Sequence, residues 1–337
     1  MTRPSFLAPE PPAGLKHGDR PTFSVVIGAY QAAETIVEAV ESALAQTEAP
    51  LEVVVCDDGS TDGTADALTP YRETIVYLRK ENGGGASALN AAVAAARGEF
   101  VVILDADDRY APERLQALAE LAIERPDLDL LTTDSSFEVD GRIIGRFSRW
   151  TPFAAGDQRA AILDRCFIMW PAIRRRRLLE QGGFDESLRI CYDWDCWIRL
   201  LLAGAAAGFV DEPLHFYKLG SHSLTTGRVA TLRERVRVLE KAAGSKLLRP
   251  EERVALEASL TEKRRRALLA ELELALRAGA PDARQRALGV AARTEFSLPT
   301  RLKAAAAAIA PGVAGSLLAR REARIGRSRL MRPLPGE

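Results

Sequence analysis

The chain has 337 residues, of which 47% are hydrophobic and 27% are charged, and its 46 Lys and Arg residues balance 46 Asp and Glu residues. Such a length allows a sizeable core, built as one large domain with additions or as two domains. A net charge of zero gives no sign of a nucleic-acid-binding protein. The four cysteines form no CxxC pair and only three histidines are present, which argues against a zinc site.

The ends of the chain carry no recognised targeting or spanning signal. The N-terminus lacks the apolar segment of a signal peptide, and no run of about 18 strongly apolar residues suggests a transmembrane helix. Scattered cysteines in a chain of this length fit reduced thiols. We therefore expect a cytoplasmic protein, with peripheral contact to the inner face of the cell membrane as a further expectation.

In chain order, residues 1–21 contain five prolines and few large apolar groups, so we expect a disordered N-terminal segment. Apolar runs then predict strands, and apolar residues at helical spacing predict the helices between them. The predicted strands are 23–29, 51–56, 74–78, 100–104 and 128–132, and the predicted helices are 33–46, 84–97 and one that begins at Pro112. This alternation predicts an α/β fold with a mostly parallel sheet flanked by helices.

The second half of the chain divides into two parts. Residues 133–225 are less regular and carry all four tryptophans, so we expect a surface there that binds a second substrate, the acceptor of a transferred group. From residue 226 to 337 the composition favours a helical C-terminal region. Residues 301–337 hold eight Arg and Lys against two Glu, interleaved with Ala and Leu. A basic amphipathic helix of this kind fits contact with an anionic bilayer, and the alternative is a packed helix with a solvated Arg face.

Acidic residues directly follow two predicted strands. Asp57 and Asp58 come after the second strand, and Asp105, Asp107 and Asp108 come after the fourth. Parallel strands present their carboxyl ends at one edge, where ligands bind, so these carboxylates would repel one another unless a cation joined them. We therefore expect Asp58, Asp105 and Asp107 to gather at one rim and share Mg²⁺ or Mn²⁺ with pyrophosphate oxygens. The alternatives are a capped turn at 57–62 and a solvated loop at 105–108.

The motifs around these acids resemble those of family 2 glycosyltransferases. The resemblance runs in order through residues 23–30, 42–47, 55–64, 81–85, 89–90, 96–99, 104–108, 182–186 and 192–200. It covers residues 22–225, which we expect to form the glycosyltransferase domain. It implies a GT-A fold, an inverting mechanism and a nucleotide-sugar donor, with a helical extension after the domain.

The resemblance also implies roles for the residues at the rim. Ala29 and Tyr30 would line the nucleotide pocket, and Asp58 would hold the base or the ribose. Asp105 would lie near the ribose and the metal, and Asp107 would bind the divalent cation. Directly after Tyr30, at the end of the first motif, Gln31 stands where the family commonly has Asn. We expect this difference to change only the shape of the pocket.

On the acceptor side, the resemblance makes Asp193 the general base that takes the proton from the acceptor hydroxyl. Tyr192 stands where the family commonly has Glu, so a neighbouring charge is lost. Asp195 we expect to be structural, at the start of a helix. His222 would contact the diphosphate from a loop. The implied partners are a nucleotide-sugar donor and a saccharide or lipid-linked acceptor, with no nucleic acid, in the synthesis of cell-surface polysaccharide or glycolipid.

Two other functions fit parts of the sequence. Residues 83–88 satisfy G-x-G-x-x-A, with Asp105 twenty residues beyond Gly85, as in NAD(P)-dependent oxidoreductases. However, polar residues separate these glycines from the preceding strand, and the fingerprint belongs in the first βα unit. The second alternative is a sugar-nucleotide-binding or scaffold protein that kept the fold without turnover, which the Tyr192 departure motivates.

Overall fold

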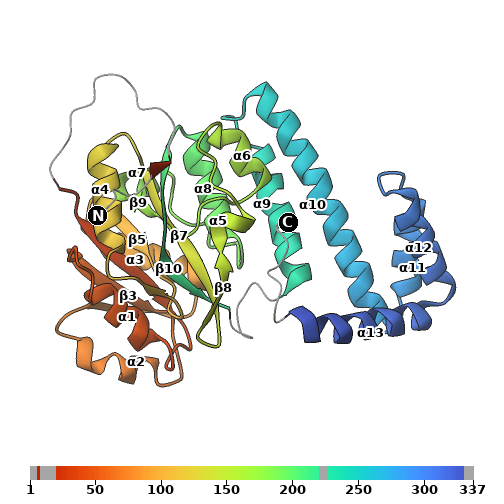
Figure 1. The fold of residues 1–337 in the computed structure, drawn as a ribbon, viewed down its shortest axis with the longest axis horizontal. Helices are drawn as coiled ribbons and strands as arrows, with labels where there is room; N and C mark the ends of the chain where they lie inside the picture. The colour runs from red at the N-terminus through yellow and green to blue at the C-terminus, as the bar shows by residue number, and fades with distance from the viewer. Residues whose placement is uncertain (1–5, 8–19, 220–226, 330–337) are drawn as a thin grey trace.

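The computed structural model describes residues 6–7, 20–219 and 227–329, with side chains as far as residue 320. Strands and helices alternate through the first part of the chain (Figure 1): β2 (Phe23–Ala29), α1 (Ile36–Leu44), β3 (Glu52–Asp57), α2 (Thr64–Ala67), the 3₁₀ turn η1 (Thr69–Tyr71), β4 (Val76–Arg79), α3 (Gly85–Ala95), β5 (Phe100–Ile103), β6 (Arg109–Tyr110) and α4 (Arg114–Glu124). Then follow β7 (Leu130–Val139), β8 (Arg142–Arg146), α5 (Phe147–Trp150), α6 (Gln158–Asp164), β9 (Ala172–Arg174), α7 (Arg175–Glu180), α8 (Tyr192–Leu202) and β10 (Ala207–Lys218).

The strands form one mixed sheet in the order β1-β10-β7-β9-β5-β2-β3-β4. Strands β4, β3, β2 and β5 pair in parallel, and β7 pairs in parallel with β10. The short β9 lies between β5 and β7 and is antiparallel to both. The six strands β2, β3, β4, β5, β7 and β10 therefore run in one direction. This confirms the predicted α/β fold with a mostly parallel sheet.

Alternate residues of the central strands point to opposite faces of the sheet and build two separate cores. Val25 and Ile27 of β2 pack with α1 and α4 on one face. Val26 packs with α3, α6 and α8 on the other. Because helices cover both faces of the sheet, the sequences of these strands are continuous apolar runs. The strands could therefore be predicted from the sequence.

The structure differs from expectation where pairing depends on distant residues. Phe6 and Leu7, inside the segment expected to be disordered, form β1 and pair with Val210 and Phe209 of β10. The predicted strand 128–132 is part of the longer β7. Strand β10 was not predicted, because Asp211, Glu212 and Pro213 interrupt its apolar pattern, and the register with β7 shifts at Pro213.

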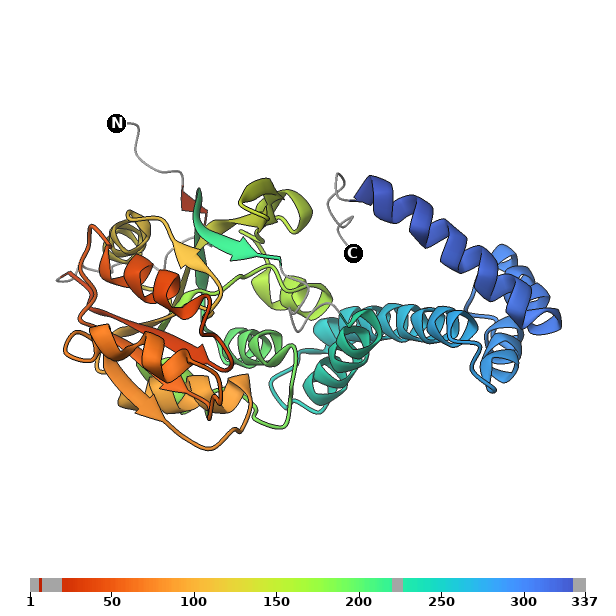
Figure 2. The same ribbon diagram turned by 90° about the horizontal axis from the view of Figure 1, so that it is seen from below.

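The C-terminal part of the chain is a helical arm (Figure 2): α9 (Arg228–Ala243), α10 (Pro250–Arg277), α11 (Ala283–Ala292), α12 (Leu298–Ile309) and α13 (Pro311–Arg329). Helices α9 and the start of α10 pack against the core on the α8 side of the sheet. The far end of α10 packs with α11, α12 and α13 around a core of its own. Among the described residues no single helix could cross a membrane, although α12 and the first part of α13 together pass that test with a bend of 117° between them.

The arm is rooted by one buried ion pair. Arg159 of α6 contacts Glu252 in the first turn of α10 through Nε and Nη2, at 2.6 and 2.9 Å. Glu252 is only 3% exposed, and Arg159 also donates to the carbonyl oxygens of Leu202 and Leu247. This single guanidinium therefore joins α6, the end of α8 and the start of α10.

Replacing Arg159 by Met should lower the free energy of unfolding by about 3 kcal/mol, because the buried Glu252 carboxylate loses its partner. Arg176→Ala, which breaks an exposed pair with Glu180, should cost less than about 0.5 kcal/mol.

Hydrogen bonding to Arg159 lowers the pKa of Glu252. The Arg159–Glu252 pair therefore contributes its full stabilisation at pH values above the ordinary carboxyl pKa. This contribution is lost as the pH falls through the lowered pKa of Glu252 in the folded protein. Urea unfolding over this pH range measures both effects, and equal stabilities of Arg159→Met and the parent would contradict the assignment.

Candidate active site

The parallel strands β2, β3 and β5 end side by side at Ala29, Asp57 and Ile103. The loops that follow them therefore share one edge of the sheet. Ala29 is buried, and its carbonyl oxygen accepts from the Asp58 backbone N–H at 2.8 Å. Tyr30, the next residue, is 54% exposed. This edge thus begins with a buried backbone turn and an exposed aromatic ring.

Asp58 is 1% exposed, and protein groups occupy both oxygens of its carboxylate. It accepts from the Gly84 backbone N–H at 2.7 Å, from the Gly83 backbone N–H at 3.0 Å and from Lys80 Nζ at 2.8 Å. Gly84 has φ of +91°, a conformation that favours glycine. Asp58 therefore fixes the loop of residues 80–84 at the start of α3.

This use of Asp58 corrects the expectation that it shares a cation with Asp105 and Asp107. Within the described residues no group of three or more His, Cys, Asp or Glu side chains could hold a metal ion. The same contacts bear on the G-x-G-x-x-A pattern. Because the Gly83 and Gly84 N–H groups are bound to Asp58, they do not form a cradle for a pyrophosphate.

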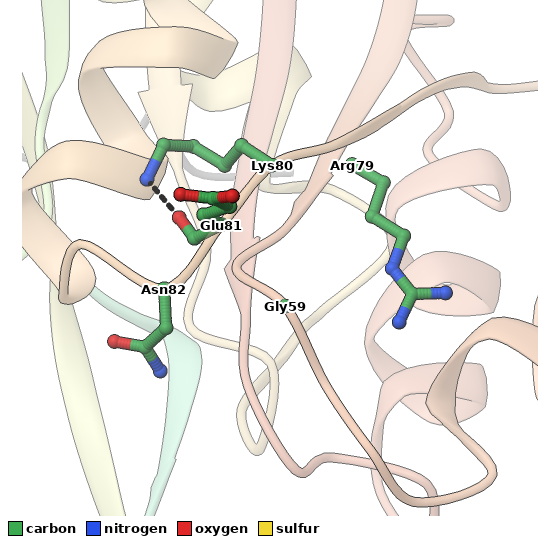
Figure 3. Close-up of a pocket in the computed structure, with 5 residues that line it drawn as sticks. All are labelled: Gly59, Arg79, Lys80, Glu81 and Asn82. Carbon is green, nitrogen blue, oxygen red and sulfur yellow. Dashed lines mark hydrogen bonds between the residues drawn. The ribbon is translucent and has the colours of Figure 1, made fainter.

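Beside this loop lies a pocket of about 550 Å³, lined by Gly59, Arg79, Lys80, Glu81 and Asn82 (Figure 3). The Arg79 and Lys80 side chains leave the backbone in different directions, and the Lys80 Nζ donates to the Glu81 carbonyl oxygen at 2.7 Å. Arg79 donates to the Ser60 carbonyl oxygen at 2.8 Å. Two cationic side chains thus flank a solvent-accessible hollow at the ends of β3 and β4.

The turn after β3 matches its structural interpretation. The Asp57 carboxylate accepts from the Ser60 backbone N–H at 2.8 Å and from the Tyr77 hydroxyl at 2.8 Å. Asp62 accepts from the backbone N–H groups of Ala33 and Thr64. The Gln31 side-chain oxygen accepts from the backbone N–H groups of residues 61 and 62. These polar groups close the turn, and each oxygen of the Asp57 carboxylate accepts a hydrogen bond within it.

The loop after β5 leaves two carboxylates at the edge. Asp105 is half-buried and Asp107 is exposed. Burial raises the pKa of Asp105 well above its ordinary value, and the carboxylates of Asp107 and Asp193 raise it further, while the Trp170 side chain hydrogen-bonds to it. Desolvation by neighbouring protein atoms also raises the pKa of Asp107, and Lys218 opposes this rise. Asp107 of the same loop and Asp193 of a second segment are therefore both close enough to Asp105 to repel its carboxylate.

The fourth residue of the acidic loop, Asp108, is structural. It is buried and contacts the Nε2 of His215 at 2.9 Å, and it accepts from the Lys218 backbone N–H at 2.9 Å. The other ring nitrogen of His215 lies 3.0 Å from the Ser135 hydroxyl. Burial lowers the pKa of His215 well below its ordinary value, so the ring is neutral, and burial raises the pKa of Asp108 well above its ordinary value. This brace fixes the acidic loop to β10 and β7.

A second brace holds Trp170. The guanidinium of Arg114, which is fully buried, donates to the Trp170 carbonyl oxygen at 2.6 Å and to the Thr133 hydroxyl at 3.0 Å. Its guanidinium carbon lies 4.4 Å from the centre of the Tyr110 ring. Trp170 has a positive φ of 32°. Arg114 thus holds a strained backbone position, and the indole at that position meets Asp105.

Helix α8 brings Asp193 to the same edge. Cys191, just before the helix, has φ of 60°, and Asp193 lies half-buried in the first turn. Burial raises the pKa of Asp193, and the Arg235 guanidinium of α9 opposes this rise. Arg235 also hydrogen-bonds to the side chain of Cys191. The carboxylate therefore stands at a helix N-terminus with one cation beside it.

Tyr192 lies between Asp193 and the glycine loop. Its ring packs edge-on against Phe184, with ring centres 5.9 Å apart. A Cβ atom on Gly85 would lie 2.7 Å from the Tyr192 hydroxyl oxygen, so Gly85 leaves the space that the phenol fills. Burial and the carboxylates of Asp105 and Asp193 raise the pKa of this phenol well above its ordinary value. It is therefore a neutral hydroxyl next to acidic groups.

Other residues of α8 serve packing and anchoring. Asp195 is 3% exposed and pairs with Arg199 and with Lys241 of α9, each at 2.8 Å. Trp194 and Trp197 are buried in the core, and the Trp194 indole N–H donates to the Ile162 carbonyl oxygen at 2.8 Å. His222 lies outside the described residues. Of the predicted site residues, Asp105, Asp107 and Asp193 come together, whereas Asp58, Ala29 and Tyr30 lie at the ends of β2 and β3.

Four residues of this site were not predicted from the sequence: His215, Arg114, Trp170 and Arg235. The only local signal for His215 was an ionisable residue within the short apolar stretch 214–217, and the only one for Arg114 was an isolated Arg at the start of α4. Arg235 sits on a helix with many exposed Arg residues, and nothing in the local sequence separates it from them. These residues are recognised by what they contact.

The chain is similar in sequence and fold to known proteins. The model of a family described as Glycosyl transferase family 2 matches residues 24–183. TuaG of Bacillus subtilis, a glycosyltransferase whose name assigns it to teichuronic acid biosynthesis, is 31% identical over 216 residues, which are 62% of this chain and 83% of TuaG. The chain spans only 19% of two other curated relatives and 59% of a third.

Two solved structures share the fold. TarS 1–349 of Staphylococcus aureus in complex with UDP-GlcNAc has a TM-score of 0.61 and 21% identity, covering 85% of this chain and 91% of that one. The mannosyltransferase PcManGT of Pyrobaculum calidifontis, in complex with GDP-Man and Mn²⁺, has a TM-score of 0.58 and 24% identity, covering 89% and 84%. Together with the family match and the likeness to TuaG, these findings show that the chain belongs to glycosyltransferase family 2.

Proposed function

We propose that this chain transfers a sugar from a nucleotide-diphosphate donor to an acceptor hydroxyl, with inversion at the anomeric carbon. The observation that supports it most directly is that Asp107 and Asp193 both lie close enough to Asp105 at the carboxyl edge of the sheet to raise its pKa. One carboxylate would act as a base, and the other two would face the diphosphate. The two solved structures, which were determined in complex with UDP-GlcNAc and with GDP-Man, support the same class of donor.

The nucleotide would bind at the ends of β2, β3 and β4. The pocket lined by Gly59 and residues 79–82 is adjacent to the Asp58 loop, and the exposed Tyr30 ring lies at the same edge. In this proposal Asp58 acts through the backbone, because its carboxylate holds Gly83 and Gly84. Arg79 and Lys80 would offset part of the charge of the diphosphate.

A divalent cation fits the two carboxylates of the acidic loop. Mg²⁺ and Mn²⁺ are commonly held by one or two carboxylates together with phosphate oxygens of the substrate. Asp107 is exposed and forms no ion pair with another described residue, and Asp105 is crowded by like charge, so both would hold the ion. Bound there, the cation would supply charge stabilisation for the departing nucleoside diphosphate.

Asp193 would accept the proton as the acceptor oxygen forms its bond to the anomeric carbon. The bond from that carbon to the β-phosphate oxygen breaks, and the nucleoside diphosphate leaves with both electrons. Inversion follows because the acceptor attacks from the face opposite the leaving group. Tyr192, a neutral hydroxyl beside Asp193, adds no second charge at this position.

The acceptor that we propose is a saccharide or a lipid-linked saccharide of a cell-surface polysaccharide. The support is the likeness to TuaG and to a succinoglycan biosynthesis protein of Rhizobium meliloti. We also propose that the helical C-terminal region makes peripheral contact with the inner face of the cell membrane. Its basic, Ala- and Leu-rich composition supports that contact.

Asp193→Asn should reduce sugar transfer by about 10²–10⁴-fold, because the amide cannot accept the proton, while nucleotide affinity stays near that of the parent. The parent should lose activity as pH falls through the raised pKa of Asp193, since the base must be ionised. Transfer is measured as nucleoside diphosphate released from a panel of UDP-, GDP- and dTDP-sugars with acceptor, and binding by calorimetry.

Asp195→Asn, two residues further along the same helix, is the matched control. It should lower stability but retain most of the turnover per folded molecule, because its carboxylate is bound to Arg199 and Lys241. An Asp193→Asn variant as fast as the parent would remove the base assignment. A parent that binds nucleotide but releases none of it as product would favour the non-catalytic alternative.

A second experiment separates the two acidic loops. With Mn²⁺ present, the parent should bind the nucleoside diphosphate of its donor roughly tenfold more tightly than with a chelator. Asp107→Ala should remove this metal-dependent gain. Asp58→Ala should weaken binding both with metal and with chelator, because it releases the Gly83–Gly84 loop. Parent binding that is unchanged by chelation would contradict the metal proposal, and identical behaviour of the two variants would contradict the separation of their roles.

A further inference from the structure

Large apolar side chains are exposed on two consecutive helices at the far end of the arm. We name residues 298–320 the elbow, which comprises α12 and the first half of α13. Five of its apolar side chains are at least 60% exposed: Leu298 (64%), Leu302 (61%), Ile309 (85%), Val313 (62%) and Leu317 (60%). Apolar exposure on this scale within 20 residues is typical of an interaction site.

The exposed residues form a stripe on each helix. Leu298, Leu302 and Ile309 are spaced four and seven residues apart, so they share the outer face of α12, while Ala304, Ala307 and Ala308 pack inward. Val313 and Leu317 share a face of α13 in the same way. The inner faces of the elbow already supply the core shared with α10 and α11, so packing within the arm does not explain the outer stripes.

The charges of the elbow all have one sign. Residues 298–320 contain Arg301, Lys303 and Arg320 and no Asp or Glu. On α12, Arg301 and Lys303 lie on opposite sides of the apolar stripe. Neighbouring parts of the arm differ, since Arg286 of α11 pairs with Asp282 at 2.7 Å and with Glu271 at 2.9 Å. The elbow thus combines exposed apolar groups with positive charge that no acidic residue of the elbow offsets.

We propose that the elbow docks on an anionic lipid bilayer. Its apolar stripes enter the boundary between headgroups and acyl chains, and its basic side chains lie at the level of the lipid phosphates. The two helices meet at 117°, so the elbow lies in the interface and does not span it. This inference deepens the proposed membrane contact by assigning it to one face, and it does not depend on sugar transfer.

Two observations favour a bilayer over a second copy of the chain. Elbows of two copies placed face to face would bring like charges together, with no acidic residue in either elbow to pair with them. The elbow also lies at the end of the arm furthest from the sheet (Figures 1 and 2), so the catalytic domain does not cover it.

The test is co-sedimentation of the full chain with vesicles. The parent should bind vesicles that contain phosphatidylglycerol and bind those of pure phosphatidylcholine at least about tenfold more weakly. Leu298→Gln, Leu302→Gln and Ile309→Gln combined should lower the partition coefficient by about a hundredfold or more. Arg301→Gln with Lys303→Gln should remove most of the preference for anionic lipid.

The matched control changes three exposed apolar residues elsewhere: Leu179→Gln, Leu247→Gln and Val254→Gln combined, which are 44%, 52% and 70% exposed in the parent. This variant should bind vesicles as the parent does, and circular dichroism should show all variants folded. Parent-like binding by the elbow variant would overturn the proposal. So would a parent dimer in light scattering that the elbow variant converts to monomer while neither binds vesicles.

Discussion

Repulsion among carboxylates at one edge of the sheet constrains the whole catalytic domain. Six aspartates of this edge bear on the site: Asp57 and Asp58 at the end of β3, Asp105, Asp107 and Asp108 after β5, and Asp193 at the start of α8. Protein groups engage three of them: Asp57 bonds to the Ser60 turn, Asp58 to the glycine loop, and Asp108 to His215. The remaining three, Asp105, Asp107 and Asp193, have little compensation inside the protein. The candidate site is therefore the part of this edge whose charge the fold does not neutralise, which is the requirement for a site that receives a cation with a diphosphate.

Residues far apart in the sequence maintain this arrangement. The family match ends at residue 183, yet Asp193, His215 and Arg235 all lie beyond it. His215 reaches the acidic loop because β10 pairs with β7, and Arg235 reaches Asp193 because α9 packs in the same core as α8. The start of the helical arm thus belongs to the active-site architecture, even though the rest of the arm has a core of its own.

The features predicted correctly from the sequence are those that depend on neighbouring residues in the chain. Strand β2 was located to the residue, and β3 and β5 to within one residue, because strands buried on both faces are continuous apolar runs. The capped turn after β3 followed from its Ser, Thr and Asp residues. The partners of Asp58 could not be predicted, because Gly83 and Gly84 lie across another strand and the choice between loop and ligand depends on tertiary distance. Strands β1 and β10 were missed for the same reason. Neither has a complete apolar pattern, and each forms a strand because it pairs with distant residues.

The apolar stripes of the elbow and the catalytic edge are far apart and belong to different cores. The connection between them is α10, a helix of 28 residues that begins at the Arg159–Glu252 pair and ends in the distal core. A continuous helix transmits orientation, since its hydrogen bonds fix each turn relative to the last. Its root is the planar guanidinium of Arg159 on α6, which bonds to the Glu252 carboxylate, to the end of α8 and to the loop before α10, and this limits rotation at the base. A surface that held the elbow would therefore also set the direction in which the catalytic edge faces, and an acceptor anchored in that surface would meet Asp193 from a restricted range of angles.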